Sequence, residues 1–178
     1  MKSRDNYKLS SCCALLGLMF LLNVPSAWSE DTDKGAEKEK TFLEYLKGQP
    51  TDTQLSLGMW TYHFDPKSRE KDNWNQKLIG IQYNDYFLAL FENSFYNWCV
   101  TAGIARNLSS TKLSDNWDMN FGYRLGLAAG YKDGEAPFST VSPIIPIVEI
   151  YNQYYFQKHF GVELMLTTSI SAGFFYQF

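Results

Sequence analysis

The sequence predicts an all-β fold: an eight-stranded antiparallel transmembrane β-barrel preceded by a short N-terminal amphipathic helix. Phe, Trp and Tyr make up 17% of the 178 residues, yet the mean hydropathy is negative, at -0.30. Strand-like segments alternate with turn signals along most of the chain. The last segment alternates aromatic side chains and ends at Phe178. Small transmembrane barrels need this composition, because aromatic girdles stand at both membrane interfaces while polar residues fill the interior.

Residues 1–29 are predicted to be a cleaved signal peptide. Basic residues precede an apolar run at 12–24, and Ala27 and Ser29 put small residues three and one before the expected cut. The run is shorter than the ~20 residues that a membrane-spanning helix needs. A lipoprotein signal is disfavoured because Cys12 and Cys13 precede the apolar run. We therefore expect the mature protein in the cell outer membrane.

The composition of the mature chain excludes several classes of protein. Only Cys99 remains after cleavage, so no internal disulfide is expected. The formal net charge of -3 becomes more negative when the basic leader is removed, and Lys and Arg do not cluster as nucleic-acid binding requires. No set of His, Cys and carboxylate residues has metal-ligand spacing. We expect no metal and no cofactor.

Residues 30–52 form a charged segment followed by the amphipathic helix. Phe42, Leu43, Tyr45 and Leu46 fall at helical spacing, before Gly48 and Pro50 end the pattern. The barrel is predicted to occupy residues 53–178. Its eight expected strands are residues 55–64, 74–83, 86–92, 98–107, 118–130, 142–155, 159–166 and 169–178.

The even number of strands predicts the orientation of a monomeric barrel. Both chain ends then lie on the periplasmic side, and the loops at 65–73, 93–97 and 131–141 face outward. Phe174, Tyr176 and Phe178 share one face of the last strand. This ending matches the signal through which outer-membrane barrels engage their assembly machinery. A soluble barrel or sandwich with an aromatic final strand is the alternative.

The outer rim brings together the candidate catalytic residues. His63 closes the first expected strand, and Asn93 and Ser94 stand in the loop between the third and fourth. A histidine near a serine hydroxyl can activate that oxygen for acyl transfer, and an amide can polarise a carbonyl. Asp65 lies two residues after His63 on the same face and is the preferred supporting carboxylate. Glu92 should point to the opposite face.

Two prolines interrupt the sixth expected strand. Pro143 and Pro146 lack the N–H group that a strand donates to its neighbour, and a closed barrel has no free edge to hold them. They predict a local gap in the hydrogen bonding through which an acyl chain can slide between strands. The alternative is that the strand begins after the prolines. Among inward-facing residues, Arg106 and Arg124 are expected to be paired with carboxylates inside the barrel.

Three segments resemble the family of lipid A palmitoyltransferases, which are small outer-membrane barrels. They are residues 91–98, residues 125–130 followed by 143–146, and the terminal residues 175–178. The chain is more similar still to uncharacterised proteobacterial envelope proteins that share the motifs at 63–66, 75–80 and 93–95. The resemblance covers nearly all of the mature chain.

This resemblance implies transfer of palmitate from a phospholipid donor to lipid A. His63 would match the family's histidine and Ser94 its serine, whereas Asn93 stands where the family has aspartate. An amide can hydrogen-bond, but it cannot hold negative charge beside an imidazolium. The alternative function is a non-catalytic barrel that binds lipid or supports the envelope. Transport is less favoured, because eight strands enclose an interior that side chains fill.

Overall fold

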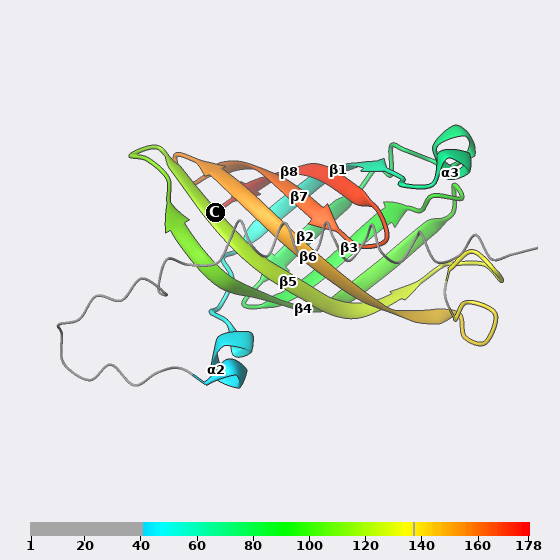
Figure 1. Ribbon diagram of the computed structural model, residues 1–178, viewed down its shortest axis with the longest axis horizontal. Coiled ribbons are helices and arrows are strands. Elements are labelled where there is room, and N and C mark those ends of the chain that lie inside the picture. The colour runs from blue at the N-terminus through cyan, green and yellow to red at the C-terminus, as the bar shows by residue number, and fades with distance from the viewer. Residues whose placement is uncertain (1–40, 137) are drawn as a thin grey trace, which may run out of the picture.

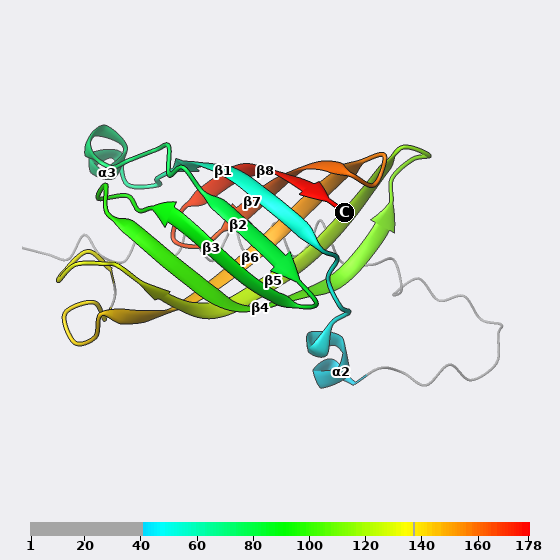
Figure 2. The ribbon, with the colours of Figure 1, turned by 180° about the vertical axis from the view of Figure 1, so that it is seen from behind.

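The computed structural model describes residues 41–136 and 138–178, which form a closed antiparallel barrel (Figures 1 and 2). The predicted signal peptide at 1–29 and the charged stretch at 30–40 lie outside the described residues. The elements in chain order are α2 (Phe42–Lys47), β1 (Gln54–Tyr62), α3 (Pro66–Lys71), β2 (Ile79–Tyr83), β3 (Tyr86–Glu92), β4 (Trp98–Lys112), β5 (Trp117–Ala129), β6 (Ile144–Phe156), β7 (Phe160–Leu166) and β8 (Ile170–Gln177).

The predicted all-β fold with eight antiparallel strands is confirmed. Each strand pairs with its neighbour in sequence, and β1 pairs with β8 to close the barrel, for example through Leu55 and Tyr176. The hairpin of β4 and β5 is longer than expected and projects at the end of the barrel where the C-terminus lies (Figure 1). All connections join adjacent strands, so the alternating turn signals in the sequence were sufficient to give the topology.

The segment before β2 was predicted as strand but is irregular. Lys77 adopts a positive φ of 43°, and Gly58 in the adjacent part of β1 has a φ of 73°. Gly58 N still donates to Leu78 O at 2.7 Å, and Gln76 N donates to Met59 O at 2.8 Å. These bonds keep residues 74–78 attached to β1 although the regular ladder ends at Ile79. These bonds therefore close the seam between β1 and β2. They also place the polar side chains of this segment at the end of the barrel that carries α3.

Two helices flank the barrel. Residues 65–73 were expected as a loop, but they contain α3, which has Pro66 in its first turn, a position where the missing N–H costs nothing. The expected helix near residue 42 is α2, whose N-terminus carries a capping box between Thr41 and Glu44. Tyr123 donates its hydroxyl hydrogen to Leu46 O at 2.9 Å, which holds α2 against the outside of the barrel.

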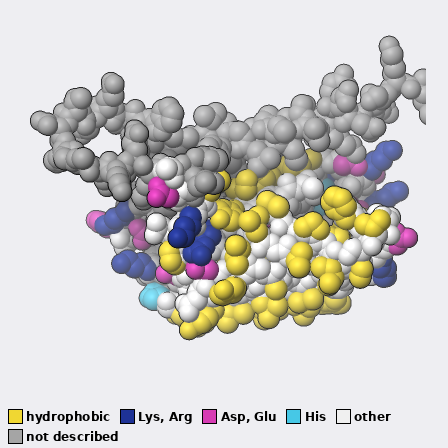
Figure 3. Space-filling view, turned by 90° about the horizontal axis from the view of Figure 1, so that it is seen from below, with side chains coloured by type: hydrophobic (Ala, Val, Ile, Leu, Met, Phe, Trp, Pro, Cys, Tyr) yellow, Lys and Arg dark blue, Asp and Glu magenta, His cyan; other side chains and the backbone are white. Residues whose placement is uncertain are grey.

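Side chains alternate between a hydrophobic exterior and a largely polar interior. In β2, Ile79, Ile81 and Tyr83 are exposed, while Gly80 and Gln82 are buried. The space-filling view shows hydrophobic side chains over the middle of the barrel and charged ones gathered toward its two ends (Figure 3). A barrel surrounded by lipid has this distribution. Within the described ranges, no helix has the length and apolar character needed to cross a membrane.

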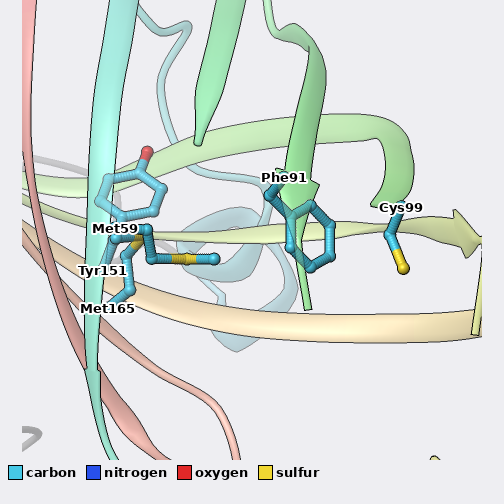
Figure 4. Packing of buried hydrophobic residues seen from close by; sticks show 5 residues of the cluster. All are labelled: Met59, Phe91, Cys99, Tyr151 and Met165. Atoms are coloured by element: carbon cyan, nitrogen blue, oxygen red, sulfur yellow. The ribbon is translucent and has the colours of Figure 1, made fainter. Parts of the chain in front are cut away.

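The apolar part of the interior is a cluster contributed by several strands. Its members are Met59, Phe91, Cys99, Tyr151 and Met165 (Figure 4). Met59, Met165 and Tyr151 lie close together in this view, with Phe91 and Cys99 farther along the barrel. Leu78 and Tyr131 pack against the cluster from the α3 end. Methionine side chains are unbranched and adaptable, so this region can change shape more readily than a core of branched residues.

A layer of charge crosses the middle of the interior. Arg124 pairs with Glu149 at 2.6 Å and with Glu163 at 2.7 Å, and its Nε donates to Gln82 at 3.3 Å. The expected pairing of Arg124 is confirmed. Arg106 was expected to face the barrel interior, and this expectation is wrong. Its two neighbours, Ala105 and Asn107, are the buried residues. Arg106 instead lies on the opposite face, where it pairs with Asp85 at 2.8 Å.

The ladder between β6 and β7 covers only part of β6. Pairing runs from Ile150 with Leu166 to Phe156 with Phe160, whereas β5 pairs with β6 along its full length. Residues 144–149 of β6 thus have no strand partner from β7 among the described residues. Pro146 is exposed and lies in this stretch opposite Leu127 of β5, and Pro143 is exposed just before β6 begins. Pro143 precedes the strand, which agrees with the alternative that β6 begins later than expected. Pro146 lies inside β6, as the main expectation had it.

Candidate functional site

The candidate site lies at the end of the barrel that carries α3. Four segments meet there: the end of β1 with His63, residues 73–76 before β2, the β3–β4 loop, and the β5–β6 loop. Figures 1 and 2 place α3 and the β5–β6 loop at the same end. Asn73 N donates to Ser94 O at 2.7 Å, which fixes the backbone of the β3–β4 loop beside the segment that precedes β2.

His63 and Ser94 are brought together as the sequence predicted. Ser94 Oγ and His63 Nε2 are 3.5 Å apart, although the residues are 31 positions apart in the chain. This separation is at the outer limit of a hydrogen bond, and catalytic pairs in ligand-free structures are often this loose. A serine hydroxyl next to an imidazole nitrogen is the minimal pair for nucleophilic catalysis.

Gln76 is a third member of the pair that the sequence analysis did not single out. Its Nε2 donates to Ser94 Oγ at 2.9 Å, and its side chain is buried. Because Gln76 fills an acceptor position on the hydroxyl oxygen, the hydrogen of Ser94 remains available to His63 Nε2. Backbone bonds from Gln76 N to Met59 O and from Glu92 N to Gln76 O hold the residue in place. Gln76 belongs to the 75–80 motif of the sequence analysis. Its orientation toward Ser94 depends on the irregular backbone of this segment, which the sequence did not predict.

Asn93 holds the loop that presents Ser94. It has no exposed surface, and its Oδ1 accepts hydrogen bonds from Phe95 N and Asn97 N, both at 2.9 Å. Its Nδ2 donates to Glu135 Oε2 at 3.1 Å. Both ends of the amide are therefore used within the protein. The geometry gives Asn93 a positioning role beside Ser94, and the polarising role predicted for it has no support from these contacts.

Glu135 of the β5–β6 loop joins the two outer loops. Besides Asn93, its carboxylate accepts from Asn97 Nδ2 at 2.6 Å and from Lys132 N at 2.9 Å. Tyr131 of the same loop packs against the apolar cluster and makes an edge contact with the ring of Phe91. Burial, together with nearby Cys99 and Glu135, raises the pKa of Tyr131 to about 12, so the phenol is neutral at physiological pH. Sequence reasoning missed Glu135 because its contacts join segments about 40 residues apart.

The other carboxylates at this rim have structural contacts. Glu92 accepts from Asn73 Nδ2 at 3.2 Å and pairs with Lys77 at 3.0 Å. Asp65 is the N-cap residue of α3, where its backbone oxygen accepts from Arg69 N at 3.1 Å while its side chain makes no capping bond. Its predicted support of His63 stays a prediction.

A small cavity lies beside the charged layer and the unpaired part of β6, and the exposed residues Ile81 and Leu88 also line it. Its volume is about 60 Å³, and Leu78, Phe87, Ile147, Glu149 and Met165 contribute to its wall. A long acyl chain would need neighbouring side chains to move, and the methionines of the apolar cluster are the residues best suited to do so.

The described part of the chain holds no group of three or more His, Cys, Asp and Glu residues placed to bind a metal ion. Comparison with protein-family models, with curated proteins and with solved structures gave no match for this chain.

Proposed function

We propose that this protein is an outer-membrane acyltransferase that moves a fatty acyl chain, palmitate-like, from a phospholipid to lipid A or another outer-leaflet lipid. The contact of Ser94 Oγ with His63 Nε2, with Gln76 bonded to the same hydroxyl, carries the proposal. These groups come from three separate segments, and their meeting is what a nucleophile with its base requires.

The chemistry follows from this pair. Ser94 Oγ attacks the acyl carbonyl carbon of the donor, and its proton passes to His63 Nε2. The tetrahedral intermediate collapses, and the lysophospholipid leaves with that proton on its oxygen. A hydroxyl of the acceptor then attacks the acyl-serine and gives its proton to His63, which returns it to Ser94 Oγ as the acyl group departs. Gln76 orients the serine hydroxyl throughout, and Asn93 keeps the loop in shape.

Access for the lipid is supported by the unpaired stretch of β6. Residues 144–149 lack a partner from β7 among the described residues, and Pro146 within them cannot donate a backbone hydrogen bond. Ile147 of this stretch also lines the small cavity. An acyl chain can therefore pass between strands without breaking a complete ladder. The hydrophobic exterior supports a membrane location, and the aromatic C-terminus supports recognition by the barrel assembly machinery.

The test is mass spectrometry of outer-membrane lipids from cells with and without the gene. Expression should add the mass of one acyl chain to lipid A or a phospholipid. His63→Ala and Ser94→Ala should abolish the addition, and Ser94→Ala should also remove an acyl-serine adduct from the protein. His159→Ala is the matched control. His159 stacks on Tyr176 at the end of the barrel opposite to α3, so it is remote from the His63–Ser94 site. Full activity in folded His63→Ala protein would remove His63 from the mechanism.

A non-catalytic barrel that binds lipid or supports the envelope is the second candidate. The small size of the cavity beside the charged layer favours it, since that cavity is only about 60 Å³ and none of the candidate catalytic residues lines it. An unchanged lipid mass, with the barrel folded and inserted, would support this function over acyl transfer.

A further inference from the structure

A second and larger cavity opens at the other end of the barrel. Its volume is about 310 Å³, and the long β4–β5 hairpin, the β6–β7 turn and the end of β8 surround it. We call it the polar cup, defined by Asn107, Asp118, Asn120, Tyr155, Lys158 and Gln177. Its size is at the lower end of the range for small-molecule sites, about 300–1,000 Å³. None of these residues takes part in the His63–Ser94 site.

The polar cup is closed toward the barrel interior. Tyr155 donates its hydroxyl hydrogen to Gln153 Oε1 at 2.6 Å, and Gln153 Nε2 donates to Gln54 Oε1 at 3.1 Å. Gln153 also bonds to Glu163, which pairs with Arg124 of the charged layer. This network blocks the lumen with side chains. The cup is thus a dead-end recess suited to holding a ligand, and not the mouth of a channel.

The wall offers hydrogen-bonding groups that the protein uses only in part. Asn107 and Asn120 are buried, and each has one amide atom engaged: Asn107 Oδ1 accepts from Tyr151 at 2.8 Å, and Asn120 Nδ2 donates to Tyr155 at 2.9 Å. Gln177 Oε1 is buried without a hydrogen-bond partner among the described residues. The cup therefore presents both donors and acceptors at fixed positions, as recognition of hydroxyl groups requires.

Buried Gln54 adds an independent observation. It has no exposed surface, and its Nε2 also has no hydrogen-bond partner among the described residues. Gln54 pairs directly with Gln177 in the ladder between β1 and β8. Two unpaired polar atoms thus occur at paired positions of the ladder, and Gln177, which carries one of them, lines the cup. An unsatisfied buried polar atom is unfavourable, and a polar ligand in the cup that bonds to Gln177 Oε1 would remove that cost.

The charges at the rim limit the class of ligand. Asp118 and Asp52 contribute carboxylates, while Lys112 lies opposite Asp118 in the ladder and is bonded to Asp115 at 3.2 Å. Lys158 is the remaining ammonium group of the wall. Neither carboxylate has an ion-pair partner among the described residues, so both can attract an ammonium group. The presence of both signs of charge disfavours binding of a polyanion. A ligand with several hydroxyl groups and an amine fits these features.

We propose that the polar cup binds an amino sugar of one or two rings. The ammonium group would lie against Asp118, and the sugar hydroxyls would bond to Asn107, Asn120 and Gln177. This binding does not depend on acyl transfer at the opposite end, so either activity can exist without the other.

The test is a titration of the mature barrel, folded in detergent micelles, with the β-1,4-linked disaccharide of glucosamine and with its fully N-acetylated form. We expect NMR shifts at the side-chain amides of Asn107 and Asn120, with the amine form binding more tightly. Asp118→Asn should weaken binding of the amine form by about tenfold, as expected for a lost charge-assisted hydrogen bond. Asp115→Asn is the matched control, because Asp115 is fully exposed outside the cup.

A blocking variant completes the design. Ser110 lines the open side of the cavity and is exposed, so Ser110→Trp should fill the recess without disturbing the barrel, and binding should be lost. Heat-dependent migration on gels would verify that each variant is folded. Absence of binding by both disaccharides, undiminished binding in Ser110→Trp, or equal affinity for the two disaccharides would overturn the proposal.

Discussion

Asn93 shows at the scale of one residue how an uncharged side chain organises the site. Its Oδ1 accepts from two backbone N–H groups, and its Nδ2 faces the Glu135 carboxylate at 3.1 Å. Only an amide can satisfy both kinds of neighbour at once. A carboxylate at this position would keep the acceptor but would place a second negative charge next to Glu135, in a buried setting where repulsion is strong. The presence of asparagine and the position of Glu135 therefore depend on each other.

This dependence predicts the outcome of a double substitution. Asn93→Asp should lower the free energy of unfolding by about 1–3 kcal/mol, because a buried donor is lost and two carboxylates face each other. Adding Glu135→Gln should restore most of the loss, since the glutamine amide can donate to the new aspartate. The measurement is urea unfolding in detergent, with Asp133→Asn as a control in the same loop. Equal stability of Asn93→Asp and the parent protein would contradict the assigned contact.

The sequence located the main pair of the site but not its supports. His63 and Ser94 could be placed together because each follows a strand that ends at the same rim. Gln76 and Glu135 could not, because their orientation depends on an irregular segment and on a contact between loops that are 42 residues apart. Periodicity gives the face of a side chain within a regular strand, and it loses that information where the ladder is interrupted.

At the scale of one element, β6 is divided into two parts by its pairing. Residues 150–156 have partners on both sides, whereas residues 144–149 are paired only with β5 among the described residues. Alternate backbone N–H groups of residues 144–149 therefore point toward the β7 side, where no ladder is formed. Pro146, which lies in this stretch, has no backbone N–H to donate on either side.

Hydrogen exchange should reveal this division. In the detergent-solubilised barrel, alternate amides within 144–149 should exchange at least tenfold faster than the amides of 150–156, because their opening does not require separation of two strands. NMR detection would assign the rate to each amide. The equivalent stretch of β5, residues 125–129, is the internal control, since it is paired with both β4 and β6. Uniform protection along β6 would contradict a lateral opening.

The sequence predicted most elements and misplaced the irregular ones. Alternating aromatic residues and turn signals gave the number and order of the strands. The helix α3 was missed because its six residues are all polar or charged apart from Pro66, and they resemble a loop. The start of β2 was misplaced because Gly58 and Lys77, both at positive φ, distort a segment whose composition is compatible with a strand.

At the scale of the whole molecule, the barrel encloses charge instead of an apolar core through its middle. Arg124 is the single cation of this layer among the described residues and touches two carboxylates, Glu149 and Glu163. It also lies over the ring of Tyr151 at 4.6 Å from the ring centre. Tyr151 belongs to the apolar cluster and also bonds to Asn107 of the polar cup, so it links these two regions beside the layer. The sequence predicted that Arg124 would have an acidic partner, but the partners became known only with the strand register.

Removing Arg124 should therefore destabilise the entire barrel. Arg124→Met leaves Glu149 and Glu163 buried without their cation, and we expect a loss of about 3–5 kcal/mol in the free energy of unfolding, as found when one partner of a buried ion pair is removed. The triple variant Arg124→Met, Glu149→Gln, Glu163→Gln removes all three charges together and should recover most of the loss. Urea unfolding in detergent would measure both. The pair of Arg106 and Asp85, which is more exposed than the Arg124 layer, is the control: Arg106→Met should cost less than Arg124→Met. A triple variant as unstable as Arg124→Met would mean that the size and shape of the arginine, and not its charge, hold the layer together.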